Sequence, residues 1–140
     1  MCLLSSAYGF GQYNSMQNLL VPDPENLANR YVALWNEDDG AARRDSIHAL
    51  WADDGWHVAP TITARGFEEL EARVARSHQR WIVENACRFR LKEAPAGHHN
   101  VLRIGWEMID PEGSVESIGT EILVFNETGK ISCVYQFIEQ

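Results

Sequence analysis

The chain has 140 residues, of which 45% are hydrophobic and 23% are charged, a composition typical of a single globular domain. Its net charge is −8, because 20 acidic residues outnumber 12 Lys and Arg. This balance argues against nucleic acid and anionic membranes as partners, since a phosphate-rich surface requires a basic protein face.

The cysteines also exclude some classes of protein. Cys2, Cys87 and Cys133 are odd in number and widely spaced, and they form neither a zinc-binding pattern nor a disulfide framework. We therefore expect free thiols, no metal and no cofactor. Residues 1–20 lack Lys and Arg, and no run of about 18 apolar residues occurs. The cytoplasm is accordingly the expected location.

Order is expected to begin after a tail at residues 1–21, with residues 22–140 forming one domain. Asp23 can cap a first helix, and Pro24 suits its first position. The apolar residues that follow recur at helical spacing: Leu27, Tyr31, Leu34 and Trp35.

A second helix is predicted with Ile47, Leu50 and Trp51 on one face, ending at Asp53 to Gly55. A short strand then covers residues 56–60. A third helix follows Gly66, and its inner stripe is predicted to contain Phe67, Leu70, Val74, Ser77, His78 and Trp81. Three basic residues are placed on or near its solvent side: Arg73, Arg76 and Arg80.

The remainder of the chain is predicted to be β-structure, with strands at 87–94, 100–109, 115–125 and 131–138. Short turns connect them, which favours an antiparallel meander. Helices followed by strands predict an α+β fold, with three N-terminal helices in the concave face of a strongly curved antiparallel sheet. Both faces of strand 115–125 are apolar, and the helices can cover only one of them. We therefore expect a homodimer that pairs through the outer face of the sheet.

Glu121 is the most informative residue, because it lies inside the apolar strand 115–125. A carboxylate there must face solvent or an enclosed site, and burial would raise its pKa. A salt bridge to Arg103 or Arg88 would instead lower that pKa. The sequence thus predicts a pocket that contains an acid.

Three segments together resemble the nuclear transport factor 2-like superfamily, and within it the SnoaL-like polyketide cyclases and ketosteroid isomerases. They are residues 30–36 (RYVALWN), 49–54 (ALWADD) and 119–125 (GTEILVF) followed by 129–131 (GKI). The resemblance covers roughly residues 24–139. It implies a cone-like fold with a deep apolar pocket, usually in a dimer.

The resemblance also implies site residues. Tyr31 matches the tyrosine that donates to the substrate oxyanion, and Glu121 matches the strand acid of the same site. The isomerase general base would fall at Ala59, which cannot accept a proton, and His57 on the same strand face could replace it. We further expect these residues to line the pocket: Leu34, Trp81, His78, Leu123, Phe125, Val134 and Gln136.

Three functions remain open from the sequence. The first is cofactor-free isomerase, cyclase or hydratase chemistry on a small hydrophobic carbonyl compound, with His57 as base and Tyr31 and protonated Glu121 as donors, or with Glu121 as the ionised acid/base. The second is a non-catalytic protein that binds a hydrophobic ligand. The third is a dimerisation or scaffold domain whose cavity is filled by side chains.

Overall fold

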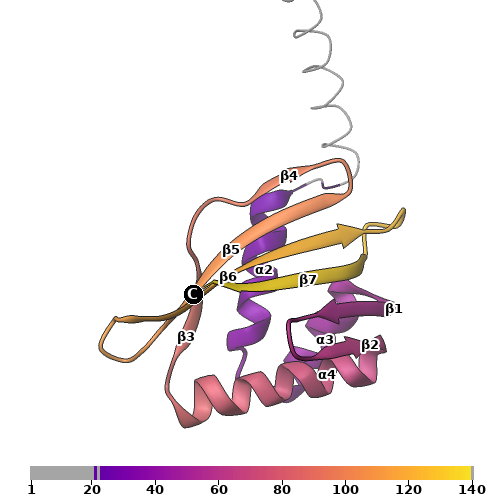
Figure 1. Ribbon diagram of the computed structural model, residues 1–140. Helices are drawn as coiled ribbons and strands as arrows, with labels where there is room; N and C mark the ends of the chain where they lie inside the picture. The colour runs from indigo at the N-terminus through magenta and orange to yellow at the C-terminus, as the bar shows by residue number, and fades with distance from the viewer. Residues whose placement is uncertain (1–20, 22, 140) are drawn as a thin grey trace, which may run out of the picture.

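The structure, a computed structural model, describes residue 21 and residues 23–139 (Figure 1). The predicted tail at residues 1–20 lies outside the described residues. Val21, which the sequence assigned to that tail, is 1% exposed and packs in the core. None of the helices within the described residues is long and apolar enough to span a membrane.

The predicted helices form, and two of them begin at side-chain caps. Asp23 accepts a hydrogen bond from the backbone N–H of Asn26, and Asp39 accepts one from that of Ala41. The helices are α2 (Pro24–Asn36), α3 (Gly40–Leu50) and α4 (Gly66–Ser77), and α4 continues directly into the π-helix η1 (His78–Glu84). A π-helical turn is uncommon, and such turns are frequent near functional sites.

The sheet has seven strands, in the order β2-β1-β7-β6-β5-β3, with β4 paired to β5 at its side. The strands are β1 (Trp51–Val58), β2 (Thr63–Arg65), β3 (Arg88–Leu91), β4 (Ala96–His98), β5 (Val101–Ile109), β6 (Val115–Phe125) and β7 (Ile131–Glu139). From β3 onward all strand pairs are antiparallel, as predicted. The long strands curve around the helices, which gives the expected α+β fold (Figure 1).

The first strands correct the sequence prediction. β1 begins at Trp51, which was predicted to be helical, and it pairs in parallel with β7. The short strand β2, which pairs with β1, was not predicted. Gly55 marked a predicted helix end, but it lies in an irregular part of β1 where the register with β7 shifts. A Cβ at Gly55 would lie 2.6 Å from Trp51 Cδ1, so this close packing requires glycine.

The main core fills the space between the helices and the inner face of the sheet. Side chains from all three α-helices meet β5, β6 and β7 there, and Ile47, Leu102 and Ile131 are completely buried. A second, smaller cluster contains Cys87, Trp106 and Met108. The second cluster lies beside the cavity described next.

Candidate active site

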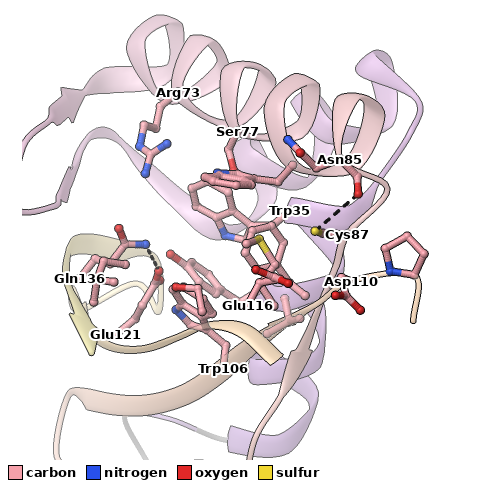
Figure 2. A pocket seen from close by; sticks show the side chains of 18 of the residues that line it. Trp35, Arg73, Ser77, Asn85, Cys87, Trp106, Asp110, Glu116, Glu121 and Gln136 are labelled. Carbon is pink, nitrogen blue, oxygen red and sulfur yellow. Dashed lines mark hydrogen bonds between the residues drawn. The ribbon is translucent and has the colours of Figure 1, made fainter. Parts of the chain in front are cut away.

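A cavity of about 750 Å³ lies between α2, the α4–η1 helix and the inner face of the sheet (Figure 2). Its size is in the range that binds small organic molecules. Five aromatic side chains contribute to its wall: Tyr31, Trp35, Trp81, Phe89 and Trp106. The cavity is therefore not filled by its own side chains, as a pure scaffold domain would require.

Glu121 lies on the wall of this cavity and is only 2% exposed. Strict alternation along β6 turns Gly119, Glu121 and Leu123 toward the helices, as the sequence predicted. Gln136, directly opposite on β7, donates a hydrogen bond of 2.6 Å from Nε2 to Glu121 Oε1. The other carboxylate oxygen, Oε2, is buried and has no hydrogen-bond partner. One oxygen of the acid is thus held in place, while the other is enclosed and has no hydrogen-bond partner.

The alternative that the sequence left open, a salt bridge from Glu121 to Arg103 or Arg88, does not form. Arg88 instead pairs with Asp38 and donates to the backbone carbonyl of Asn36. Arg103 is exposed on β5, opposite Ile122, which belongs to the outer face of the sheet. Within the described residues, the ion-pair partner of Glu121 is His57.

His57 lies next to Glu121, but it is not among the residues that line the cavity. The Nε2 atom of His57 is 3.8 Å from Glu121 Oε1, and the imidazole is 1% exposed. The ring also packs against Trp35, with the ring centroids 5.3 Å apart. Neither ring nitrogen has a hydrogen-bond partner. His57 is therefore placed to support the carboxylate rather than to contact a ligand.

Tyr31 contributes a buried hydroxyl to the same polar cluster. The side chain is 1% exposed, and the hydroxyl has no hydrogen-bond partner of good geometry. Burial raises the pKa of Tyr31 well above its ordinary value, and the negative charge of Glu121 raises it further. The Tyr31 hydroxyl accordingly stays protonated across the neutral pH range and can donate a hydrogen bond. The indole N–H of Trp35 is also buried without a partner on this wall.

The ionisation of Glu121 is decided by opposing effects. Burial raises the pKa of Glu121, whereas the interactions with His57, Tyr31 and Gln136 together lower it, and the pKa lies below the ordinary glutamate value. Glu121 is therefore a carboxylate at neutral pH. Of the two forms that the sequence left open, the lowered pKa favours the ionised one.

Arg73 is a cavity residue that the sequence analysis placed on or near the solvent side of its helix. The guanidinium lies over the indole ring of Trp35, at 5.5 Å from the ring centroid, and lines the cavity wall. A signal was present in the sequence, because Arg73 lies three residues after Leu70 and four before Ser77, on the same helical stripe.

The predicted wall residues divide into two groups. Trp81 and Gln136 line the cavity. The other apolar ones lie in the main core instead and do not line the cavity: Leu34, Leu123, Phe125 and Val134. They point inward as expected, but they occupy the end of the sheet that the helices fill.

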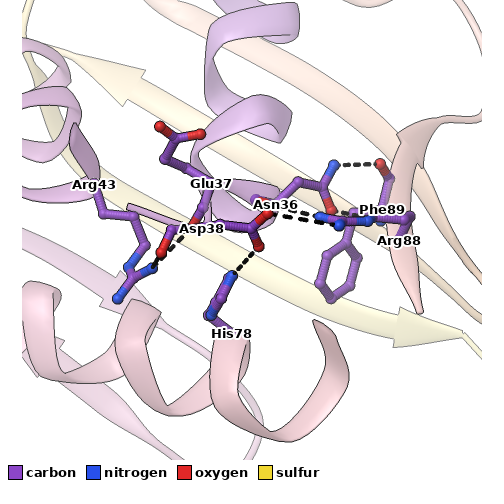
Figure 3. A network of polar contacts seen from close by, with 7 residues as sticks. All are labelled: Asn36, Glu37, Asp38, Arg43, His78, Arg88 and Phe89. Atoms are coloured by element: carbon purple, nitrogen blue, oxygen red, sulfur yellow. Dashed lines mark hydrogen bonds and ion pairs between the residues drawn. The ribbon is translucent and has the colours of Figure 1, made fainter. Parts of the chain in front are cut away.

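His78, also predicted to line the pocket, belongs to a polar network beside it (Figure 3). His78 Nε2 lies 2.9 Å from Asp38 Oδ1, and this hydrogen bond lowers the pKa of Asp38. The adjacent Asn36 receives a hydrogen bond from the backbone N–H of Phe89 and donates one to its carbonyl. The network ties the end of α2 to η1 and to the edge strand β3, and it fixes the position of Phe89 in the cavity wall.

Acidic side chains surround another part of the cavity wall, at the turn between β5 and β6. They are Asp110, Glu112 and Glu116. The part of the chain that the structure describes has no group of three or more His, Cys, Asp and Glu side chains that could bind a metal ion. The thiol of Cys87 also lines the cavity, and burial raises its pKa, so it is a poor nucleophile.

Several solved structures are similar to this chain in fold. An isomerase candidate of the SnoaL-like family from Agrobacterium tumefaciens is 30% identical, with a TM-score of 0.76, over 82% of this chain and 96% of that one. A nuclear transport factor 2-like protein of unknown function from Exiguobacterium is 21% identical, with a TM-score of 0.61, over 81% of this chain and 98% of that one. A candidate polyketide cyclase from Sinorhizobium meliloti is 12% identical, with a TM-score of 0.62, over 80% and 94% of the two chains.

These similarities define the class of protein. The chain belongs to the SnoaL-like family. No family model matches the sequence, and no curated protein matches it. The similarity to the other two structures, at 21% and 12% identity, supports the fold alone.

Proposed function

We propose that this protein catalyses cofactor-free acid–base chemistry, as an isomerase, cyclase or hydratase, on a small hydrophobic carbonyl compound bound in the cavity. The observation that carries the proposal is the buried carboxylate of Glu121, which lies on the wall of an open cavity with one oxygen unpartnered. Membership of a family that includes an isomerase candidate supports the same reaction class.

The proposed roles follow from the positions of the groups. Glu121 Oε2 accepts the proton from the carbon next to the carbonyl, because it is the carboxylate oxygen that has no hydrogen-bond partner. The Tyr31 hydroxyl donates to the carbonyl oxygen as that oxygen becomes an enolate. The hydrogen bond from Gln136 holds the carboxylate in place, and His57 lies beside it. The proton returns from Glu121 to the product, so the carboxylate is regenerated.

The lowered pKa makes Glu121 a weak base in the free protein. Binding of a carbonyl compound would change this, because the Tyr31 hydroxyl, which has no well-formed hydrogen bond in the free protein, would donate to the substrate oxygen and no longer interact with the carboxylate. The loss of that interaction, and exclusion of water by the ligand, would both raise the pKa of Glu121 toward that of a useful base.

Exchange of carbon-bound hydrogen for deuterium tests this function without knowledge of the natural substrate. The probe is 2-tetralone, a flat ketone with acidic hydrogens, incubated with the protein in D₂O and followed by proton NMR. Wild type should accelerate exchange over buffer, and E121Q should lose about 100-fold or more of that acceleration. The matched control E127Q removes an acid at the exposed turn between β6 and β7, away from the cavity wall, and should retain the rate. Exchange equal to that in buffer, or equal exchange by wild type and E121Q, would contradict the proposal.

A second function, non-catalytic binding of a hydrophobic ligand, is favoured by Ala59 at the position of the isomerase base and by the low pKa of Glu121. It predicts that 2-tetralone binds in the cavity without enhanced exchange. Under this alternative, E121Q changes the dissociation constant of the ketone and no rate.

We also propose that two copies of the chain pair through the outer face of the sheet. Tyr135 and Phe137 on β7 are 47% and 58% exposed, and they lie opposite Ile122 and Thr120 on β6. Large exposed aromatic side chains that adjoin further apolar residues are typical of an interface. A second copy would cover this surface with an equivalent one.

A further inference from the structure

Arg73 differs in charge from every other side chain that lines the cavity. Among the described lining residues it is the one Lys or Arg, and it enters the cavity from α4. Figure 2 shows the guanidinium pointing toward the part of the wall that contains Glu121 and Gln136. The group therefore faces the space in which the proposed reaction takes place.

Arg73 also lacks the partners that other arginines of this chain have. Arg43 donates to backbone carbonyls, and Arg90 pairs with Glu107 at 2.7 Å. For Arg73 the structure has no hydrogen bond or ion pair within the described residues, and its buried Nε has no partner. The indole of Trp35 covers one face of the guanidinium, but the N–H donors point outward from the edge of that plane. An arginine that is held in place by stacking and has unpaired N–H donors can bind an oxyanion.

The charges around Arg73 allow such a ligand. Glu121 and Tyr31 influence the guanidinium across the cavity without contacting it, which leaves space between them for another group. The acids at the β5–β6 turn would instead favour a cation. However, Glu112 and Glu116 are exposed to solvent, and Asp110 already accepts backbone N–H groups at 2.9 and 2.8 Å. In contrast to these acids, Arg73 has a buried Nε that contacts neither solvent nor a hydrogen-bond acceptor.

We propose that Arg73 binds an ionised oxygen of the ligand, so that the compound that enters this cavity carries a carboxylate or an equivalent oxyanion. The aromatic wall would hold the apolar body of the ligand, and the guanidinium edge would bind the two oxygens of a carboxylate. This deepens the proposed function, on which it rests for the enolisable carbonyl, by making the substrate an acidic carbonyl compound. Binding of the anion itself requires no turnover.

Three probes of the same shape test the charge preference. They are 2-naphthoate, the neutral ketone 2-acetonaphthone and the cation 2-naphthylmethylammonium, each titrated into the protein by isothermal calorimetry. Wild type should bind 2-naphthoate at least about tenfold more tightly than either of the other two. R73Q should weaken 2-naphthoate by about 10- to 100-fold and change 2-acetonaphthone less than threefold. R73K, which keeps the charge without the planar fork, should fall between them.

The matched control is R76Q, which removes the same charge from an exposed position of the same helix. It should bind all three probes as wild type does, which separates a local contact from the change in net charge. Thermal unfolding by circular dichroism verifies that each variant is folded. Equal binding of 2-naphthoate by wild type and R73Q overturns the proposal, as does tighter binding of the cation or no binding of 2-naphthoate. Because no rate is measured, failure of the exchange experiment with 2-tetralone leaves this result unaffected.

Discussion

Gly119 allows Trp106 to form part of the cavity wall, and a single methyl group should disturb this arrangement. The two residues face each other on β6 and β5. A Cβ built on Gly119 would lie 2.2 Å from Cζ2 and 2.4 Å from Cε2 of Trp106. The indole would have to retreat by roughly 1 Å, and overpacking of this kind costs about 1–3 kcal/mol. The gain from replacing glycine in a strand is about 0.5–1 kcal/mol, so the net destabilisation of G119A should lie between about 0 and 2.5 kcal/mol.

The assay is urea unfolding, with G105A as the matched control. Gly105 lies on the adjoining β5, but its added Cβ would meet the far end of the exposed Glu93 side chain, which can move. G105A should therefore be neutral or stabilised by up to about 1 kcal/mol. Trp106 also packs edge-on against Phe89, with ring centroids 5.4 Å apart, so the near-ultraviolet dichroism of G119A should change as well. Equal unfolding free energies for G119A and G105A would refute the close packing of Trp106 on Gly119.

Three further predictions concern acid sensitivity, the polar network and the outer face. Because the folded-state pKa of Glu121 is depressed, wild type should have a higher unfolding free energy than E121Q at pH 7. This difference should shrink as the pH falls below about 4.3. A difference that stays constant from pH 7 to pH 3 would contradict the depressed pKa. N36A removes two hydrogen bonds to Phe89, of 2.7 and 2.8 Å, and should lower the unfolding free energy measured in urea by about 1–3 kcal/mol. A loss below about 0.5 kcal/mol would contradict the role of Asn36 in fixing Phe89. F137E should convert a dimer to a monomer in sedimentation velocity with the fold retained, and a wild type that is already monomeric would exclude this interface.

The helices and the antiparallel part of the sheet could be predicted because their patterns are local. Helical spacing and caps define α2, and alternation along β6 places Glu121 on the inner face. The parallel pairing of β1 with β7 joins segments about 80 residues apart, and no local pattern encodes it. Gly55 was misread for the same reason, since its close neighbours include the carbonyl of Ile131 on the other strand.

The acid of the candidate site was predictable, but its surroundings were only partly so. A carboxylate inside an apolar strand is visible in the sequence, and so is a histidine on a predicted inner strand face. Whether that histidine reaches the cavity depends on the depth at which Trp35 and Glu121 pack over it, which only the tertiary structure decides. The wall residues Leu123 and Val134 were misplaced because period-two alternation identifies a face and not a position along it.

The ionised carboxylate of Glu121 is the central feature of this account, and carbon-13 NMR of the glutamate side-chain carboxyls measures it most directly. The Glu121 signal would be assigned by its absence from E121Q and followed from pH 3 to pH 8. The account predicts a titration midpoint below the ordinary glutamate value of about 4.3, so that the group is fully ionised at neutral pH. A carboxyl that remains protonated at pH 7 would contradict it, because Glu121 would then be a hydrogen-bond donor and could not accept the substrate proton.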